Sequence, residues 1–327
     1  MNQSHPFEQL KPDTVIDAVE STGLLSDARI FALNSYENRV YQVGVEEADP
    51  VIVKFYRPGR WTDEQILEEH GFTKELSDLE IPVVPPVIDN QGQTLHEFAD
   101  FRFTVFPRKG GRSPELSLDN LLIMGRFIGR IHAVGAISQF QYRQTLSIER
   151  FAEASASFLL ENDFIPAELI AAYSSLAEDL INRIHGIFST NQPPAQIRIH
   201  GDCHMGNVLW RDDIPHFVDF DDTMTGPAIQ DLWMLLSGDR NQKLAQLSEL
   251  IEGYNEFFDF NPAELPLIES MRTLRLMHYS AWLARRWDDP AFPLHFPWFN
   301  TQIYWAQHIL ELREQMSALD EQPLILY

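Results

Sequence analysis

Asp202, Asn207 and Asp219 are the side chains of this sequence whose types and spacing best suit a chemical reaction. Asp202 stands on a tight turn after a short apolar run, and Asn207 follows five residues later and opens a second run, residues 208–210. Asp219 ends a third run, residues 217–218, at a spacing of 17 from Asp202. Two short strands joined as a hairpin would bring Asn207 and Asp219 side by side, with Asp202 on the loop above them.

The three side chains together suit phosphoryl transfer from a nucleotide to a hydroxyl group. In that reaction one carboxylate accepts the proton of the attacking hydroxyl, while a carboxamide oxygen and a second carboxylate hold Mg2+ on the phosphates. Mg2+ prefers hard oxygen ligands and takes few of them from the protein. We therefore predict that Asp202 is the catalytic base and that Asn207 and Asp219 bind Mg2+, which makes Asp219 catalytic as well. ATP is the expected phosphoryl donor.

Residues 200–207, His-Gly-Asp-Cys-His-Met-Gly-Asn, resemble the catalytic loop of the aminoglycoside phosphotransferase and choline kinase superfamily. Residues 218–222, Val-Asp-Phe-Asp-Asp, resemble the metal-binding strand end of that superfamily. Further segments resemble the bacterial stress response kinase A family: 33–41, 53–58, 65–70, 226–233 and 288–293. Because the similarity spans nearly the whole chain, the sequence is identified as a member of that family.

The resemblance implies a protein serine/threonine kinase that also phosphorylates itself and acts in stress survival. The same catalytic loop serves kinases of choline, homoserine and aminoglycosides, so the expected acceptor is a hydroxyl group of a protein or of a small molecule. A pseudokinase scaffold is a third interpretation. It is disfavoured because a scaffold has no need of an intact Lys54, Asp202, Asn207 and Asp219.

Two lobes are expected. Residues 30–56 and 94–106 are rich in β-branched and aromatic residues, which predicts antiparallel strands. Proline and glycine in residues 106–112 indicate a hinge, and the chain beyond it is mainly helical. Together with the resemblance, these features predict an α+β, bilobal, protein-kinase-like fold. Its small antiparallel-sheet N-lobe comprises residues 1–108, and its larger, mainly helical C-lobe comprises residues 109–327.

Lys54 lies inside an otherwise apolar strand, where a lysine is costly to bury unless it is paired. In the kinase arrangement this lysine binds the nucleotide phosphates and is oriented by a glutamate from the next helix. Glu68 and Glu69 are both candidates. We choose Glu69 because Phe72 and Leu76 share its helical face, although Glu68 also shares a face with Phe72.

Residues 34–39 form a polar loop without glycine, in the place of a phosphate-covering loop. The resemblance implies that Ser35 contacts the ATP phosphates. From the residues alone, a plain hairpin turn is the alternative.

Composition limits the range of partners. The chain has 327 residues and a formal net charge of -23, so most of its surface repels nucleic acid and anionic membrane. It contains no apolar run of about 18 residues and no visible signal peptide, and its single cysteine fits a reducing compartment. We expect a cytoplasmic monomer that binds neither nucleic acid nor membrane.

Other features have competing interpretations. His200, Asp202 and His204 have the spacing of a transition-metal site, but that reading leaves Asn207 and Asp219 unexplained. Cys203 is either a redox-sensitive thiol or an inert one, and the inert interpretation is favoured.

Four arginines are concentrated between residues 271 and 287: Arg272, Arg275, Arg285 and Arg286. They suit either contacts with the acidic strand or a phosphorylated substrate, or structural salt bridges, and the second is favoured. Residues 287–299 are expected to pack as a wall over the substrate cleft.

Overall fold

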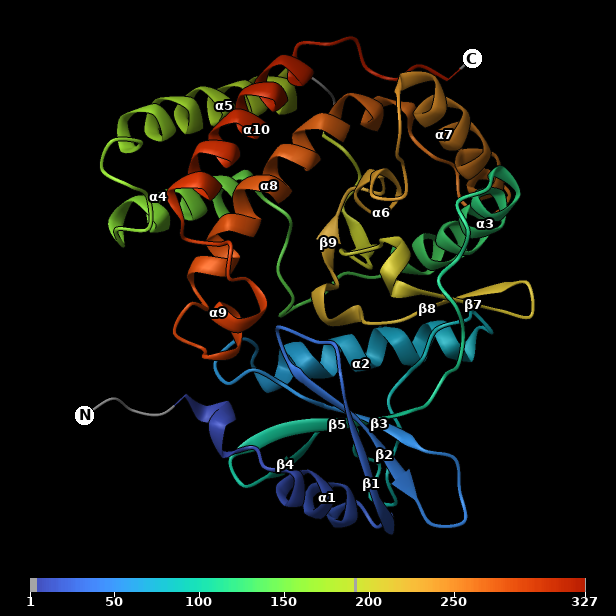
Figure 1. The fold of residues 1–327 in the computed structure, drawn as a ribbon. Coiled ribbons are helices and arrows are strands. Elements are labelled where there is room, and N and C mark those ends of the chain that lie inside the picture. Colours follow the sequence, from blue (N-terminus) through green and yellow to red (C-terminus); the bar gives the residue numbers. More distant parts are fainter. Residues whose placement is uncertain (1–4, 191–192, 327) are drawn as a thin grey trace.

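The structure is a computed structural model that describes residues 5–190 and 193–326. It has two lobes, and the fold class expected from the sequence is confirmed (Figure 1). The chain passes from the smaller lobe to the larger one after a strand that ends at Pro107 and before a helix that begins at Leu118. We propose that the lobes divide near Arg108.

The small lobe is built on a five-stranded antiparallel sheet, in the order β1-β2-β3-β5-β4. The strands are β1 (Ser26–Leu33), β2 (Arg39–Val45), β3 (Val51–Phe55), β4 (His96–Phe98) and β5 (Phe101–Pro107). Helix α1 (Pro12–Ser21) covers one face, where Val15, Ala18 and Val19 pack with buried strand residues such as Val53 and Phe103. This apolar layer holds β3, and therefore Lys54, in place.

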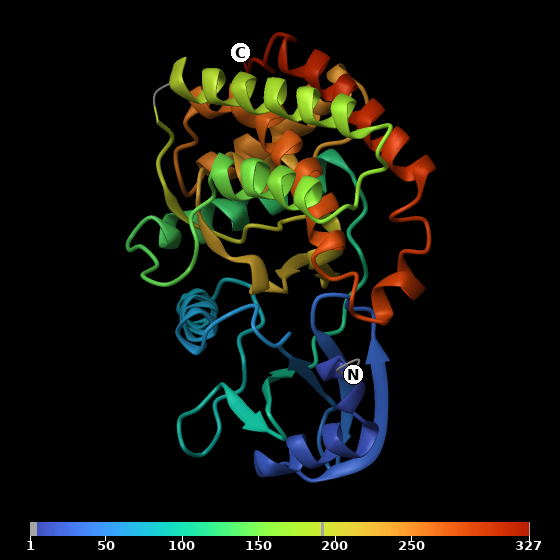
Figure 2. The same cartoon turned by 90° about the vertical axis from the view of Figure 1, so that its left-hand side faces the viewer.

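Helix α2 (Asp63–Asp78) connects the lobes. It begins with a capping box between Thr62 and Gln65, which satisfies free backbone donors of its first turn. Phe72 and Leu76 belong to the apolar core of the large lobe. Figures 1 and 2 both show α2 between the sheet and that lobe. Glu69 is thereby brought to the boundary between the lobes.

The large lobe is mainly helical. Its helices are α3 (Leu118–Gly135), α4 (Ala154–Glu161), α5 (Ile170–Thr190), α6 (Ile229–Trp233), α7 (Arg240–Asn255), α8 (Ile268–Ala284), α9 (Ala291–His295) and α10 (Gln302–Leu319). A short π-helical turn, Glu149–Glu153, precedes α4. Two small antiparallel pairs complete the lobe: β6 (Ile197–Ile199) with β9 (Met224–Gly226), and β7 (Val208–Arg211) with β8 (Ile214–Phe217).

Helices α3 and α7 pack closely through glycines. A Cβ atom on Gly125 would lie 2.0 Å from the carbonyl oxygen of Leu250, and one on Gly253 would lie 2.0 Å from that of Leu122. Gly125 and Gly129, which are four residues apart in α3, therefore allow the two helices to approach closely. Within residues 5–190 and 193–326, every helix is too short or too polar to cross a membrane.

Glu264, in the short 3-10 helix Pro262–Leu267, gives the stability of the large lobe a pH dependence. It is buried and accepts the backbone N–H of Ile229 at 2.9 Å. Burial raises its pKa from 4.5 to about 7, so between these values the folded protein binds more protons than the unfolded chain. Stability should therefore fall as pH rises through that window.

We expect the unfolding free energy of the wild type, measured relative to that of Glu264→Gln, to fall by about 2 kcal/mol from pH 5 to pH 8. The glutamine variant lacks the titrating group, so it corrects for all other groups. Urea unfolding of both proteins at the two pH values measures the difference. An equal difference at both would contradict the prediction.

Candidate active site

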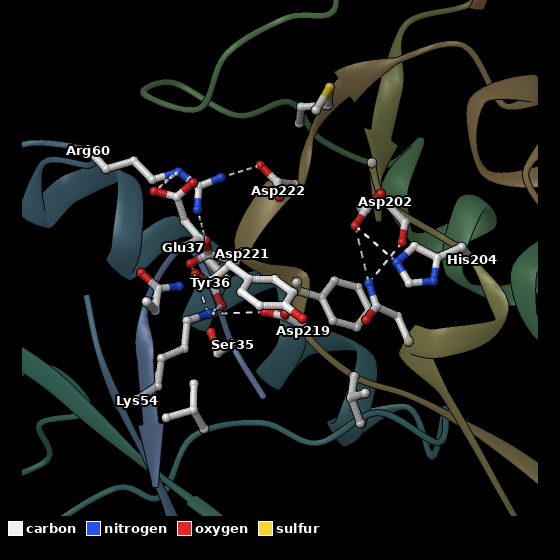
Figure 3. Close-up of a pocket in the computed structure, with 18 of the residues that line it drawn as sticks. Ser35, Tyr36, Glu37, Lys54, Arg60, Asp202, His204, Asp219, Asp221 and Asp222 are labelled. Atoms are coloured by element: carbon white, nitrogen blue, oxygen red, sulfur yellow. Dashed lines mark hydrogen bonds and ion pairs between the residues drawn. The ribbon is translucent and has the colours of Figure 1, made fainter. Parts of the chain in front are cut away.

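A cavity of about 1100 Å³ lies between the lobes, and all six residues predicted to form the site line it. They are Ser35, Lys54, Glu69, Asp202, Asn207 and Asp219. Figure 3 shows Lys54 with Asp219 and Asp221 in one part of this cavity, and Asp202 with His204 in another.

The β7–β8 hairpin brings Asn207 and Asp219 to the same end of one ladder. Val208 pairs with Phe217, and the N–H of Val218 donates to the carbonyl of Asn207 at 3.0 Å. Asp219 then takes a left-handed backbone conformation, with φ at 61°, and starts a 3-10 turn. This is the hairpin geometry that the sequence spacing predicts.

Asp231 anchors the loop that carries Asp202. Its Oδ2 atom accepts the N–H of His200 at 2.7 Å, and its Oδ1 atom accepts the N–H of Gly201 at 2.8 Å. The ring of His132 lies 3.0 Å from the same carboxylate and reaches Tyr254 on its other side. Because all of these groups are buried, the loop is held to the core of the large lobe by a satisfied polar network.

Asp202 is held as a carboxylate. Its Oδ1 atom lies 2.6 Å from a guanidinium nitrogen of Arg275, and its Oδ2 atom lies 3.4 Å from the ring of His204. Burial raises the pKa of Asp202, but the hydrogen bond with His204 and the charge of Arg275 outweigh burial and hold the pKa below its ordinary value. The group is therefore ionised at neutral pH, which is the protonation state that a general base requires.

The residues at the predicted metal site have the donor chemistry that suits Mg2+. The carboxamide nitrogen of Asn207 donates to the backbone oxygen of Asp202 at 3.0 Å, which leaves the carboxamide oxygen available to a cation. The Asp219 side chain is 57% exposed, so its carboxylate can reach a ligand in the cavity. Both donors are hard oxygens, as Mg2+ prefers.

The alternative transition-metal site receives no support. Both ring nitrogens of His200 have partners, the N–H of Asp202 at 3.3 Å and the carbonyl of Val218 at 3.0 Å. In the described part of the chain, no group of three or more His, Cys, Asp or Glu side chains is placed to hold a metal. Cys203 is buried, and burial raises the pKa of its thiol, which fits the inert interpretation.

Lys54 is buried among three carboxylates. Its Nζ atom lies 2.9 Å from Asp221, 3.3 Å from Asp219 and 3.5 Å from Glu69. Burial lowers the pKa of Lys54, but these carboxylates raise it well above the ordinary value. Glu69 is thus the glutamate that pairs with Lys54. Glu68 instead accepts the backbone N–H groups of residues 141–143.

Two arginines complete this charged cluster. Arg60 pairs with Asp221, and Arg143 donates to Glu69 at 2.9 Å and to the carbonyl of Asp221 at 2.7 Å. In the sequence, Asp221 belongs to residues 218–222, which resemble a metal-binding strand end, but neither it nor the two arginines was assigned a role of its own. The adjacency of Asp221 to Asp219 was a usable signal, whereas nothing in the local sequence marks Arg60 or Arg143.

The loop of residues 34–38 is tied to the large lobe. Glu37 accepts the indole N–H of Trp282 at 2.6 Å and also pairs with Arg57 and Arg286. Ser35 lines the cavity, as a phosphate-covering loop requires. The ring of Tyr36 also lines the cavity and packs against His295 and Phe296.

Residues 287–299 hold the small lobe and do not form the expected wall over the cleft. Asp289 is buried and pairs with Arg39 at 2.8 Å and Arg57 at 2.7 Å. Of the described residues that line the cavity, none comes from this segment, and α8 supplies the wall instead. The expectation was wrong because Asp289 binds two arginines of the small lobe, which holds the segment against the loop of residues 34–38.

The contacts of the four arginines between residues 271 and 287 fit both interpretations, a role at the catalytic site and structural bonding. Arg275 contacts Asp202, whereas Arg286 pairs with Glu37 and Arg272 pairs with Glu269 at 3.2 Å. Arg285 donates to the carbonyl of Ala154 at 2.9 Å.

A sheet lobe, a helical lobe and a cavity between them with paired lysine and carboxylates define a kinase-like phosphotransferase. A model of the phosphotransferase enzyme family matches residues 29–268. Stress response kinase A of Shigella flexneri is 45% identical over 326 residues, which cover 99% of this chain and 98% of that protein. The serine/threonine protein kinase RdoA of Salmonella typhimurium is 42% identical over 321 residues, which cover 98% and 97%.

The chain therefore belongs to the phosphotransferase enzyme family and, within it, to the stress response kinase A family. A solved structure of amicoumacin kinase in complex with AMP-PNP, Ca2+ and Ami has the same fold, with a TM-score of 0.72 over 94% of each chain and 20% sequence identity. Family membership implies a nucleotide phosphoryl donor and a hydroxyl acceptor.

Proposed function

We propose that this protein is a serine/threonine protein kinase that uses ATP and Mg2+, phosphorylates itself as well as other proteins, and acts in stress response. The names of its full-length relatives support the acceptor class and the physiological role. The observation that carries the proposal is that Asp202, Asn207, Asp219 and the Lys54–Glu69 pair line one cavity between the lobes.

In the proposed reaction, a serine or threonine hydroxyl beside Asp202 attacks the γ-phosphorus of ATP. The bond from oxygen to phosphorus forms as the bond from phosphorus to the leaving oxygen of ADP breaks, and the hydroxyl proton passes to Asp202. Mg2+ bound by Asn207 and Asp219 would supply positive charge at the phosphates.

In this proposal Lys54 would bind the α- and β-phosphates, and the loop containing Ser35 would cover them. Residues 106–109 line the cavity at the connection between the lobes, where the adenine ring would lie. Catalysis then consists of positioning the reactants and neutralising charge. The single cysteine and the acidic surface support a cytoplasmic monomer as the working form.

Incubation of the pure protein with labelled ATP tests the proposal, with and without added protein acceptors and small hydroxyl compounds such as choline or homoserine. Label on the protein itself and on added proteins is the expected result. Label on the small compounds alone would favour a small-molecule kinase. Nucleotide binding without turnover on any acceptor would favour a pseudokinase.

Removing divalent cations with EDTA should stop phosphoryl transfer, because Asn207 and Asp219 then have no cation to hold on the phosphates. Adding Mg2+ in excess of the chelator should restore the rate. The thermal unfolding midpoint in EDTA serves as the control, since a stable fold shows that the loss is catalytic. An unchanged rate in EDTA would contradict the predicted metal site.

A further inference from the structure

One face of α8 forms the acceptor side of the cavity. Lining residues of α8 and of the turn that follows it recur at helical spacing: Arg275, His278, Tyr279 and Trp282 in the helix, and Arg285 and Arg286 just after its end. Arg150, from the turn before α4, lines the same cavity. This concentration of arginine is unexpected in a chain with a formal net charge of -23.

Two of these arginines have no acidic partner. Neither Arg150 nor Arg285 forms an ion pair with any carboxylate that the structure describes, whereas Arg286 is neutralised by Glu37. The guanidinium of Arg285 rests over the ring of Phe158 at 4.9 Å from its centroid. Arg150 and Arg285 therefore leave uncompensated positive charge in the cavity.

The positive charge lowers the pKa values of groups in this part of the cavity. Burial, and then the charges of Arg285 and Arg60, lower the pKa of Arg150. The charge of Asp222 raises the pKa of Arg150, but Asp222 is already paired with Arg60 at 2.5 Å. Burial and the surrounding arginines lower the pKa of His278 to about 3, so this ring is neutral at physiological pH. The pocket around His278 thus has a positive potential that favours anions.

The arginines are spaced along the cleft. Arg275 contacts Asp202, and Arg285, the C-cap residue of α8, lies ten residues further along the chain, which corresponds to about 15 Å of helical rise. An extended peptide advances roughly 3.3 Å per residue. A peptide whose hydroxyl lies at Asp202 would therefore place a side chain near Arg285 about four or five residues away.

The surface between the two ends suits a peptide. The rings of Tyr279 and Trp282 are stacked, with centroids 5.7 Å apart, and Tyr279 is 40% exposed. Such rings offer contact area to backbone and aliphatic groups. A small cationic acceptor, by contrast, would meet like charge along this wall.

We propose that this side of the cavity selects an acidic peptide. Arg150 and Arg285 of the kinase would contact aspartate or glutamate side chains of the peptide, about four or five residues from the phosphorylated serine or threonine. The proposal rests on the proposed function, and it adds the class of protein segment that the kinase accepts. Guanidinium groups suit this role because they bind carboxylates through paired hydrogen bonds.

The test compares three synthetic peptides of equal length, each with one serine and with glutamate, lysine or glutamine at the flanking positions. We expect the glutamate peptide to have a KM at least about tenfold below that of the lysine peptide. Arg150→Glu should remove or reverse this preference. Arg150 makes no side-chain hydrogen bond or ion pair with a residue that the structure describes, so its replacement should leave the fold intact.

Arg313→Glu is the matched control, because Arg313 is exposed on α10 and does not line the cavity. It should keep the preference for glutamate. The neutral variant Arg150→Gln, with its thermal unfolding midpoint, separates a loss of charge from a loss of fold.

Equal KM values for the three peptides would overturn the inference and leave the proposed function standing. A change in the KM for ATP, with that for the peptide unchanged, would also overturn it, because the arginine would then belong to the nucleotide site. Phosphorylation of small hydroxyl compounds but of no peptide would overturn the proposed function itself.

Discussion

Replacing Asp202 by asparagine should lower the rate of phosphoryl transfer by about a thousandfold, which is within the range for loss of a general base. A carboxamide has nearly the same shape as the carboxylate but cannot take up the hydroxyl proton. ATP binding should persist, because Lys54 and the loop containing Ser35 lie in another part of the cavity (Figure 3). The measurements are the rate of label transfer and the dissociation constant of ATP from calorimetry.

Asp212→Asn is the control for this experiment. Asp212 lies in the turn of the same β7–β8 hairpin, and its side chain is 84% exposed. Its left-handed backbone conformation, with φ at 53°, is one that asparagine also tolerates. Wild-type turnover in Asp202→Asn would defeat the assignment of the base.

Replacing Asp231 by alanine should lower the unfolding free energy by about 3 kcal/mol or more, since the N–H groups of His200 and Gly201 and the ring of His132 lose a buried acceptor. The same change should slow phosphoryl transfer, because the loop that positions Asp202 is no longer anchored. Urea unfolding measures the first effect, and single-turnover transfer measures the second.

Asp231→Asn provides the graded comparison. Its one carboxamide oxygen can accept from one backbone donor, so both losses should be smaller than in the alanine variant. If the alanine variant kept wild-type stability and rate, the network around Asp231 would have no part in holding the loop.

The hairpin that brings Asn207 and Asp219 together could be predicted because it depends on local features. The spacing of three short runs sets the turn, and the residue types set the chemistry. The helix that begins after Thr62 could also be predicted, since its capping box is a local pattern.

The choice between Glu68 and Glu69 could not be settled in the same way. Both residues share a helical face with Phe72, and their roles are separated only by contacts that are distant in sequence. Glu68 is engaged by the backbone of residues 141–143, and Glu69 by Lys54 and Arg143. A single sequence contains no record of such partners.

The position of residues 287–299 also depends on contacts between residues that are distant in sequence. The segment carries a distinctive pattern of aromatic residues and proline, which predicted packing but not the surface it packs against. That surface is decided by the pairing of Asp289 with Arg39, which is 250 positions away.

The bonds that Glu37 and Asp289 make across the two lobes have a kinetic consequence. Arg39, Arg57 and Glu37 belong to the small lobe, and their partners include Trp282, Arg286 and Asp289 of the large lobe. The lobes cannot swing apart to exchange nucleotide without exposing these buried charges. We therefore expect departure of ADP, and not the chemical step, to set the pace of repeated turnover.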